Sequence, residues 1–223
     1  PHYEMETSFH PARVCGVDEA GRGPLAGPVV AACVMFTHER AIPQGLNDSK
    51  KLTARTRTLL ARQLRENPEQ ILIGVGIAVV EEIDTLNIWG ATALAMRRAF
   101  EAMPQTAEHA LIDGHLHPPQ FPCPTHPVIG GDGISLSIAA ASIIAKTTRD
   151  TLMEEYSLAY PEYGFHKHAG YGTRAHMAAL QTHGVTPIHR RSFAPVRLLH
   201  ASASHRLRGM LAPRPLRAPP HQC

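Results

Sequence analysis

The sequence predicts an α/β fold with a mixed sheet flanked by helices and a helical C-terminal region. Short β-branched runs, starting with Val14–Asp18 and Val29–Met35, alternate with stretches that repeat apolar residues at helical spacing. The Gly- and Pro-rich segment Gly21–Pro28 joins these two strands in about ten residues, too few for a helical crossover. An antiparallel start must therefore be followed by β-α-β units. With 223 residues, 43% of them hydrophobic, the chain can bury the core that such a fold needs.

Caps, periodicity and breakers predict the remaining elements. Thr53 can cap a helix that ends near Arg65, with Pro68 just beyond it. The segment His115–Pro127 holds five prolines in thirteen residues, which predicts a surface loop. Trp89 is expected in core or helix-edge packing. The other predicted elements are strand Ile71–Val80, helix Asn87–Met103, strand Ala110–Ile112, a strand at Val128 and Ile129, a long helix Ser135–Tyr160 that Ala139–Ala141 allow to pack closely, and helix Thr173–Thr182.

Charge and cysteine usage restrict the class of protein only broadly. The net charge is +3, but the segment 198–223 carries four arginines and no acid, which leaves residues 1–197 at −1. We expect an N-terminal arm at residues 1–12, a catalytic domain at residues 13–197 and a basic, disordered tail at residues 198–223. Four scattered cysteines without a CxxC favour a reducing cytoplasm, and no apolar stretch or leader predicts contact with a membrane.

Four acidic residues stand where apolar strands end. Asp18 and Glu19 follow the first strand, Asp113 ends the sequence ALID, and Asp132 follows VIGG. Burying a carboxylate is costly unless it is paired or binds a metal, and Mg²⁺ prefers such hard oxygen ligands. Each acid taken alone could instead cap a helix or form a turn, as Asp132 could between its two glycines.

Gly21-Arg22-Gly23 directly follows the acidic pair. Glycines allow close backbone approach and arginine offers a fork that matches phosphate, so this segment could hold a phosphate beside a metal site. A nucleotide-binding domain with GRGPLAG as its phosphate loop is a weaker alternative, because no lysine follows Gly27.

Longer motifs then carry a family resemblance. The segments VCGVDEAGRGPLAGPVVAACV, LNDSKKLT, ALIDG, GGDGISLSIAAASIIAKTTRD, YPEYGFHKHAGYGT and HRRSFAPV occur in this order. Together they resemble ribonuclease HII of the bacterial type, in the type 2 ribonuclease H family, over about Arg13–Arg197. The resemblance implies a ribonuclease H-like fold with a mixed five-stranded sheet. The sister ribonuclease HIII, which normally has an N-terminal extension and lacks the GRG element, is a less suitable alternative.

The resemblance also implies the activity. Asp18, Glu19, Asp113 and Asp132 would hold two divalent ions, Mn²⁺ or Mg²⁺. The enzyme would act as an endonuclease on RNA–DNA hybrids, and it would incise on the 5′ side of single ribonucleotides in duplex DNA, leaving 3′-hydroxyl and 5′-phosphate ends. Nucleic acid would be its partner, and it is expected to be a monomer. A metal-free binding module on the same fold is the rival from another class, and the presence of all four acids disfavours it.

The matching motifs also imply which residues contact the substrate. The resemblance implies that Gly21, Arg22 and Gly23 read the ribose 2′-hydroxyl and the adjacent phosphate, and that Tyr171 packs beside the junction sugar or base. Gly130 departs from the family pattern, which often has lysine there. Lys146 and Arg149 could equally lie on a solvated helix face near Asp150. Residues expected to approach the nucleic-acid backbone are Lys50, Lys51, Ser142, Lys146, Arg149, Lys167 and Thr173.

Overall fold

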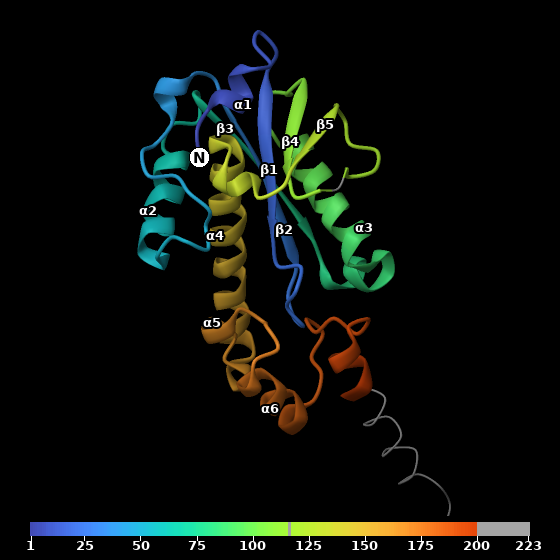
Figure 1. Ribbon diagram of the computed structural model, residues 1–223. Helices are drawn as coiled ribbons and strands as arrows, with labels where there is room; N and C mark the ends of the chain where they lie inside the picture. Colours follow the sequence, from blue (N-terminus) through green and yellow to red (C-terminus); the bar gives the residue numbers. More distant parts are fainter. Residues whose placement is uncertain (116, 200–223) are drawn as a thin grey trace, which may run out of the picture.

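A five-stranded sheet forms the centre of the computed structural model, which describes residues 1–115 and 117–199 (Figure 1). The strand order is β3-β2-β1-β4-β5. β2 pairs antiparallel with both β1 and β3, whereas β1–β4 and β4–β5 are parallel pairs. The predicted mixed sheet is thus confirmed. The strands are β1 (Val14–Ala20), β2 (Val29–Phe36), β3 (Ile71–Ala78), β4 (His109–Asp113) and β5 (Thr125–Val128).

β2 separates two halves of the core. All eight of its residues are buried, and its side chains alternate between two hydrophobic clusters, as the two-residue period of a strand requires. Ala31 and Cys33 face α3 (Val80–Glu101), whereas Ala32 and Val34 face α2 (Ala54–Arg65) and α4 (Leu136–Ala159). Helices therefore cover both faces of the sheet.

α4 packs unusually closely on β1. A Cβ built on Gly16 would lie 2.2 Å from the backbone nitrogen of Ile138, so only glycine fits at this position. The small residues Ala139–Ala141 are fully buried in the apolar cluster that α4 shares with α2 and the sheet, which agrees with the predicted close packing. The Ser135 side chain accepts a hydrogen bond from Ile138 N and caps this helix. Close packing at the start of α4 places the preceding segment, which contains Asp132, beside the end of β1.

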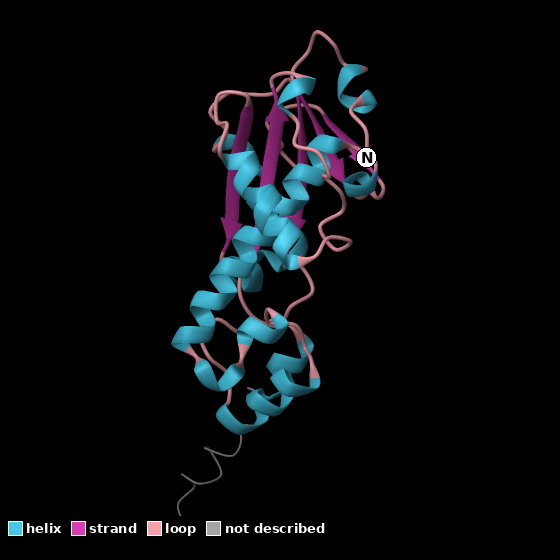
Figure 2. Ribbon diagram, turned by 90° about the vertical axis from the view of Figure 1, so that its left-hand side faces the viewer, coloured by secondary structure: helices cyan, strands magenta, loops and turns pink. Residues whose placement is uncertain are grey.

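The C-terminal helical region lies beyond the sheet, around the far end of α4 (Figures 1 and 2). It contains α5 (Phe165–His168), α6 (Arg174–His183) and the 3-10 turn η3 (Pro161–Tyr163). Leu25 and Ala26, from the connection between β1 and β2, are buried in its apolar cluster. This region therefore packs directly against the 21–28 loop, by which we mean Gly21–Pro28.

Several predicted boundaries were wrong. β3 ends at Ala78, and α3 begins at Val80 and not at Asn87. Asn87 lies inside α3 with φ 60°, and its Oδ1 accepts hydrogen bonds from Trp89 N and Gly90 N. The predicted start thus corresponds to a second N-terminus created by a kink, where the side chain of an asparagine replaces the missing backbone acceptor.

The proline-rich segment also differs from the prediction. Its end, from Thr125, forms β5, whereas Ile129 lies outside the strand. Pro127 is tolerated because β5 is an edge strand, where a missing N–H need not break a ladder. The prediction did not include the short elements α1 (Glu4–Thr7) in the arm, η1 (Glu39–Ala41), η2 (Gly131–Gly133), η3 and α5. The expected tail falls outside the described residues from residue 200 onward. None of the described helices is long and apolar enough to span a bilayer.

Candidate active site

Three carboxylates meet at one edge of the sheet. Asp18 lies in β1 and Asp113 ends the parallel neighbour β4, one position beyond the paired residues Val17 and Ile112. Asp132 comes from η2, and this turn is tied to β4 by a 2.8 Å hydrogen bond from Gly131 N to Asp113 Oδ1. Each of the three acids offers an oxygen within 4.8 Å of the others.

Burial makes this cluster electrostatically unfavourable without a cation. Asp18 is 4% exposed and Asp132 is 7% exposed. Burial, followed by the nearby charges of Glu19 and Asp113, raises the pKa of Asp18 well above its ordinary value. Burial and Asp113 also raise the pKa of Asp132. Clustered hard oxygen donors of this kind fit a divalent ion such as Mg²⁺ or Mn²⁺.

Glu19 lies beside the three-acid cluster but is not part of it. It follows Asp18 in the strand, and its backbone N–H donates to Asp18 Oδ1 at 2.7 Å. Its carboxylate accepts a 3.2 Å hydrogen bond from Arg22 Nη1. Burial raises the pKa of Glu19, while the charge of Arg22 opposes that rise. The fourth acid is therefore within reach of the site and paired with a cation.

Arg22 lies between Glu19 and an exposed aromatic ring. Its guanidinium carbon is 4.2 Å from the ring centroid of Trp89, in cation–π geometry. Trp89 is 44% exposed on α3, so of the two expected environments, core or helix edge, it has the second. The kink at Asn87 starts a new helical turn at this point, which presents the ring to the site.

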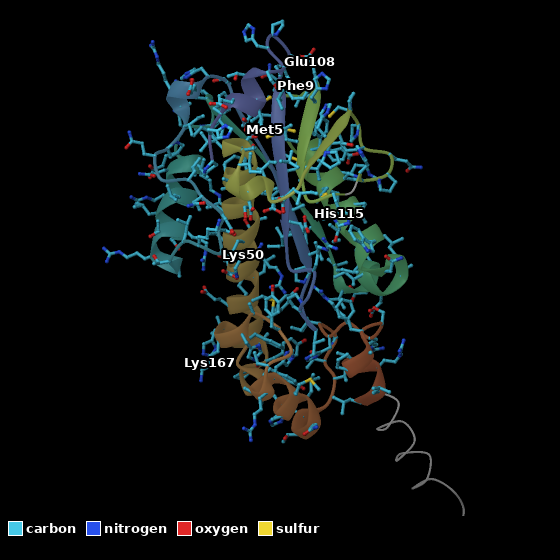
Figure 3. All side chains as sticks on the ribbon, viewed as in Figure 1. Met5, Phe9, Lys50, Glu108, His115 and Lys167 are labelled. Atoms are coloured by element: carbon cyan, nitrogen blue, oxygen red, sulfur yellow. The ribbon has the colours of Figure 1, made fainter. Side chains whose placement is uncertain are left out.

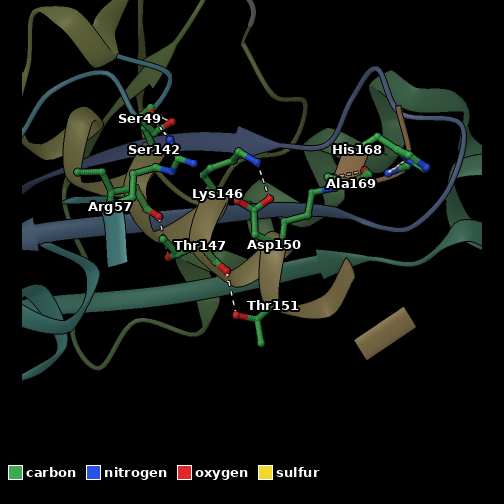
Figure 4. Close-up of polar contacts among 12 residues, drawn as sticks. Ser49, Arg57, Ser142, Lys146, Thr147, Asp150, Thr151, His168 and Ala169 are labelled. Atoms are coloured by element: carbon green, nitrogen blue, oxygen red, sulfur yellow. Dashed lines mark hydrogen bonds and ion pairs between the residues drawn. The ribbon is translucent and has the colours of Figure 1, made fainter. Parts of the chain in front are cut away.

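A cavity of about 250 Å³ lies next to this site, and Glu19 is the acid that lines it. Gly23 faces Tyr171, since a Cβ on this glycine would be 3.5 Å from the Tyr171 ring, and that ring is 49% exposed. Ser142 shares a 2.9 Å hydrogen bond with Ser49 at the cavity wall (Figure 4). The cavity is lined by Glu19, Ala20, Gly21, Arg22, Gly23, Ser49, Lys50, Ser142, Lys146, Arg149 and Tyr171.

Two lysines bring positive charge to this region. Lys50 Nζ is 3.9 Å from Asp132 Oδ2, and its pKa is raised because Asp18 and Asp132 outweigh partial burial. Lys146 forms an ion pair with Asp150 one helical turn away (Figure 4). Both lysines line the cavity, and each is paired with an acid.

The other expected contacts lie at varied positions. Lys51 is exposed and pairs with Asp48 at 3.9 Å, and Lys167 is exposed in α5, farther along the molecule (Figure 3). Thr173 caps α6, where its side chain accepts from His176 N. Gly130 has φ 65°, a left-handed conformation that favours glycine over lysine.

Arg149 differs most from the expectation. It is 1% exposed and therefore does not lie on a solvated helix face. Its guanidinium donates to three backbone carbonyls, two of them in the 21–28 loop. Arg190, which the sequence analysis did not single out, makes similar bonds. Only its place in the HRRSF motif could have pointed to it.

Comparisons with known proteins agree with this geometry. The Ribonuclease HII family model matches residues 15–196. The Ribonuclease HII of Gluconobacter oxydans is 53% identical over 207 residues, which span 92% of this chain and 99% of that protein. The crystal structure of ribonuclease H2 from Pyrococcus horikoshii gives a TM-score of 0.70 at 26% identity, covering 85% and 98% of the two chains. Bst-RNase HIII in complex with Mn²⁺ shares the fold, with a TM-score of 0.65 at 20% identity, over 87% of this chain and 71% of that one.

Proposed function

Because this chain belongs to the ribonuclease HII family, we propose that it incises duplex DNA on the 5′ side of single embedded ribonucleotides. Its general activity follows from the family: it is an endonuclease that hydrolyses the RNA strand of RNA–DNA hybrids. The products would carry 3′-hydroxyl and 5′-phosphate ends. The catalytic unit would be residues 13–197, which is supported by the family match over residues 15–196.

One observation carries the proposed chemistry: three carboxylates within 4.8 Å, next to a cavity lined by Arg22, Lys50 and Tyr171. Asp18, Asp113 and Asp132, with Glu19 alongside, would hold two divalent ions, Mg²⁺ or Mn²⁺. Such ions supply charge that acidifies an attacking water and stabilises the leaving 3′ oxygen. The four acids bind and orient, and no side chain forms a covalent intermediate.

The adjacent cavity supports a role in ribonucleotide recognition. Gly21 and Gly23 leave the backbone open to approach, and Arg22 can donate to a phosphate or to the 2′-hydroxyl, the group that distinguishes RNA from DNA. Tyr171 offers an exposed face for a sugar or base. Contacts to the phosphate backbone are assigned to Lys50, Lys51, Ser142, Lys146, Lys167 and Thr173.

Asp113→Asn and Asp18→Asn test the metal assignment. Each variant should lose roughly 100-fold or more of the cleavage of a duplex carrying one ribonucleotide, because loss of a carboxylate ligand weakens binding of the ions that stabilise transition-state charge. The assay is run with Mg²⁺ and with Mn²⁺. Near-normal cleavage by either variant with either metal would overturn the assignment.

Arg22→Ala tests recognition separately from chemistry. Cleavage of the single-ribonucleotide duplex should fall more than binding of plain duplex DNA does, because plain DNA offers phosphates but no 2′-hydroxyl. Mapping of the cut shows whether it lies 5′ of the ribonucleotide. An equal loss on both substrates would make Arg22 a general phosphate contact only.

The same function implies a cellular setting. Ribonucleotide removal from replicated DNA would place the enzyme in the cytoplasm, acting as a monomer on its duplex. Cys15 and Cys33 are free and buried, which suits a reducing compartment. Sedimentation of the protein with and without duplex would test the monomer.

A further inference from the structure

Arg149 connects the two segments proposed to read the ribonucleotide. From α4, its Nε and Nη2 donate to the carbonyls of Pro28 and Ala26, both at 3.0 Å. Its Nη1 donates at 3.0 Å to the carbonyl of Ala169, two residues before Tyr171. One buried side chain therefore holds the 21–28 loop and the Tyr171 segment at a fixed separation.

Arg190 grips the same loop from another direction. It is 0% exposed, and its Nε donates to Gly27 O at 2.9 Å. Its Nη1 donates to Arg22 O at 2.9 Å, and its Nη2 donates to Gly21 O at 2.6 Å. These bonds fix the peptide groups before and after Arg22. They therefore also fix the direction in which the Arg22 side chain leaves the backbone.

The conformation of Gly21 depends on this packing. Gly21 has φ 98°, and a Cβ there would lie 2.0 Å from Arg149 Nε. The absence of a side chain lets the guanidinium approach the loop backbone this closely. Leu25 adds two further ties, since its N–H donates to Gly170 O at 2.8 Å and its carbonyl accepts from Arg190 N at 2.9 Å.

A contribution to folding stability does not by itself explain why these two buried residues are arginines. Within residues 1–115 and 117–199, neither forms an ion pair with a carboxylate. Burial lowers the pKa of Arg149 to about 10, and burial with the charge of Arg149 lowers that of Arg190 to about 9. Buried charges are generally costlier than apolar side chains of similar size, even when hydrogen bonds compensate them.

We infer that Arg149 and Arg190 are positioning residues that hold Gly21–Gly23 and Tyr171 as one rigid reader of the ribonucleotide. This inference rests on the proposed function of those residues. Rigid donors recognise a substrate group better than mobile ones, because less ordering is needed on binding. Neither arginine needs to touch the substrate to affect selectivity.

Arg190→Lys tests this inference, because it keeps the positive charge but leaves one nitrogen to serve the four carbonyls that the guanidinium reaches, those of Gly21, Arg22, Gly27 and Pro28. The measurement is the ratio of kcat/KM on a single-ribonucleotide duplex to kcat/KM on a long RNA–DNA hybrid. We expect this ratio to fall by about tenfold. Arg149→Lys should lower it in the same direction.

Leu64→Ala is the matched control. Leu64 is fully buried in α2, in a different apolar cluster, so its truncation lowers stability without touching the 21–28 loop. Its ratio should equal that of the unmodified protein at a comparable loss of Tm. If Leu64→Ala lowers the ratio as much as Arg190→Lys does, the arginines have only a structural role and the inference is wrong.

A double variant separates this inference from the proposed function. If Arg190 acts through Arg22, Arg190→Lys should change the ratio little further in an Arg22→Ala background. An unchanged ratio in Arg22→Ala alone would refute the proposed role of Arg22 in reading the ribonucleotide. A lowered ratio in Arg22→Ala with an unchanged ratio in Arg190→Lys would refute the inference only.

Asp84→Ala provides a second test, which does not require the arginine variants to fold. Asp84 in α3 accepts hydrogen bonds from Arg191 N and from Ser192 N and Oγ, and so anchors the segment that carries Arg190. Asp84→Ala should lower the ratio by about threefold, since it loosens this anchor without emptying the core. If Asp84→Ala folds and leaves the ratio unchanged, the inference is overturned even where Arg190→Lys does not fold.

Discussion

Arg22 is held between the carboxylate of Glu19, at 3.2 Å, and the ring of Trp89, at 4.2 Å from the centroid. The acid pulls the guanidinium toward the metal site, and the ring supports its flat face. Glu19 accepts from one N–H of Arg22 and the ring contacts only the flat face, so the other N–H groups of a positioned guanidinium can donate to a substrate phosphate. We therefore expect Trp89 to help orient Arg22 toward the substrate.

Trp89→Ala should raise KM for the single-ribonucleotide duplex by about two- to fivefold, the range expected for an exposed cation–π contact. The KM of Trp89→Phe should lie between those of the unmodified protein and Trp89→Ala. Because Trp89 is the sole tryptophan of the chain, its fluorescence should also change on binding this duplex in Ca²⁺, and the change should be smaller in Arg22→Ala. An unaltered KM in Trp89→Ala would show that the ring does not help to orient Arg22.

Asp18→Asn should stabilise the metal-free protein while abolishing cleavage. Burial and two neighbouring acids disfavour the ionised Asp18, so a neutral amide removes a repulsive charge from the folded state. We expect a higher Tm in EDTA at pH 7, by about 2–4 °C per kcal/mol gained. Added Mn²⁺ should raise the Tm of the unmodified protein more than that of the variant. Equal Tm increases with Mn²⁺ would remove Asp18 from the ligand set.

His189 gives the C-terminal region a dependence on pH. Its Nδ1 accepts from Thr186 N at 3.0 Å, so its proton is on Nε2, which donates to His176 Nε2 at 3.0 Å. The proton of His176 is then on Nδ1, which donates to Tyr171 O at 2.9 Å. Burial and the charge of His176 lower the pKa of His189 to about 4.

The sign of that dependence follows from the lowered pKa. In the unfolded chain His189 takes up a proton below about pH 6.5, whereas in the folded protein it resists protonation. Its contribution to the free energy of unfolding is therefore fully present above this pH and is lost as the pH falls toward 4. Urea unfolding should show a loss of about 1–2 kcal/mol between pH 7 and pH 5 that His189→Gln reduces. His10→Gln, at an exposed position, should keep the pH slope of the unmodified protein. Identical slopes for all three proteins would contradict this prediction.

Gly16→Ala should destabilise the protein by about 1–3 kcal/mol, because the new methyl group would push α4 away from β1. Gly133→Ala is the control, since a Cβ there meets only Lys51 Nζ at 3.8 Å, and it should change stability by less than about 0.5 kcal/mol. Chemical denaturation of both variants provides the comparison. A stable Gly16→Ala would mean that α4 can shift at no cost.

The sequence by itself determined much of the local structure and the chemistry of the site. The caps Thr53 and Ser135 are recognisable because each is a polar residue directly before a helical apolar pattern. The β-branched run Val29–Met35 predicted the strand that the structure shows as β2. Acids at strand ends predicted a metal site, since carboxyl ends of parallel strands meet at one edge of a sheet.

Only the tertiary structure decided how these parts interact. It brought Asp18, Asp113 and Asp132 together while it paired Glu19 with Arg22. It also turned Arg149, an expected substrate contact, into a buried donor to backbone carbonyls. The physical reason is that contacts between residues distant in the sequence depend on burial and on hydrogen-bond geometry. Neither quantity exists until the helices have packed on the sheet.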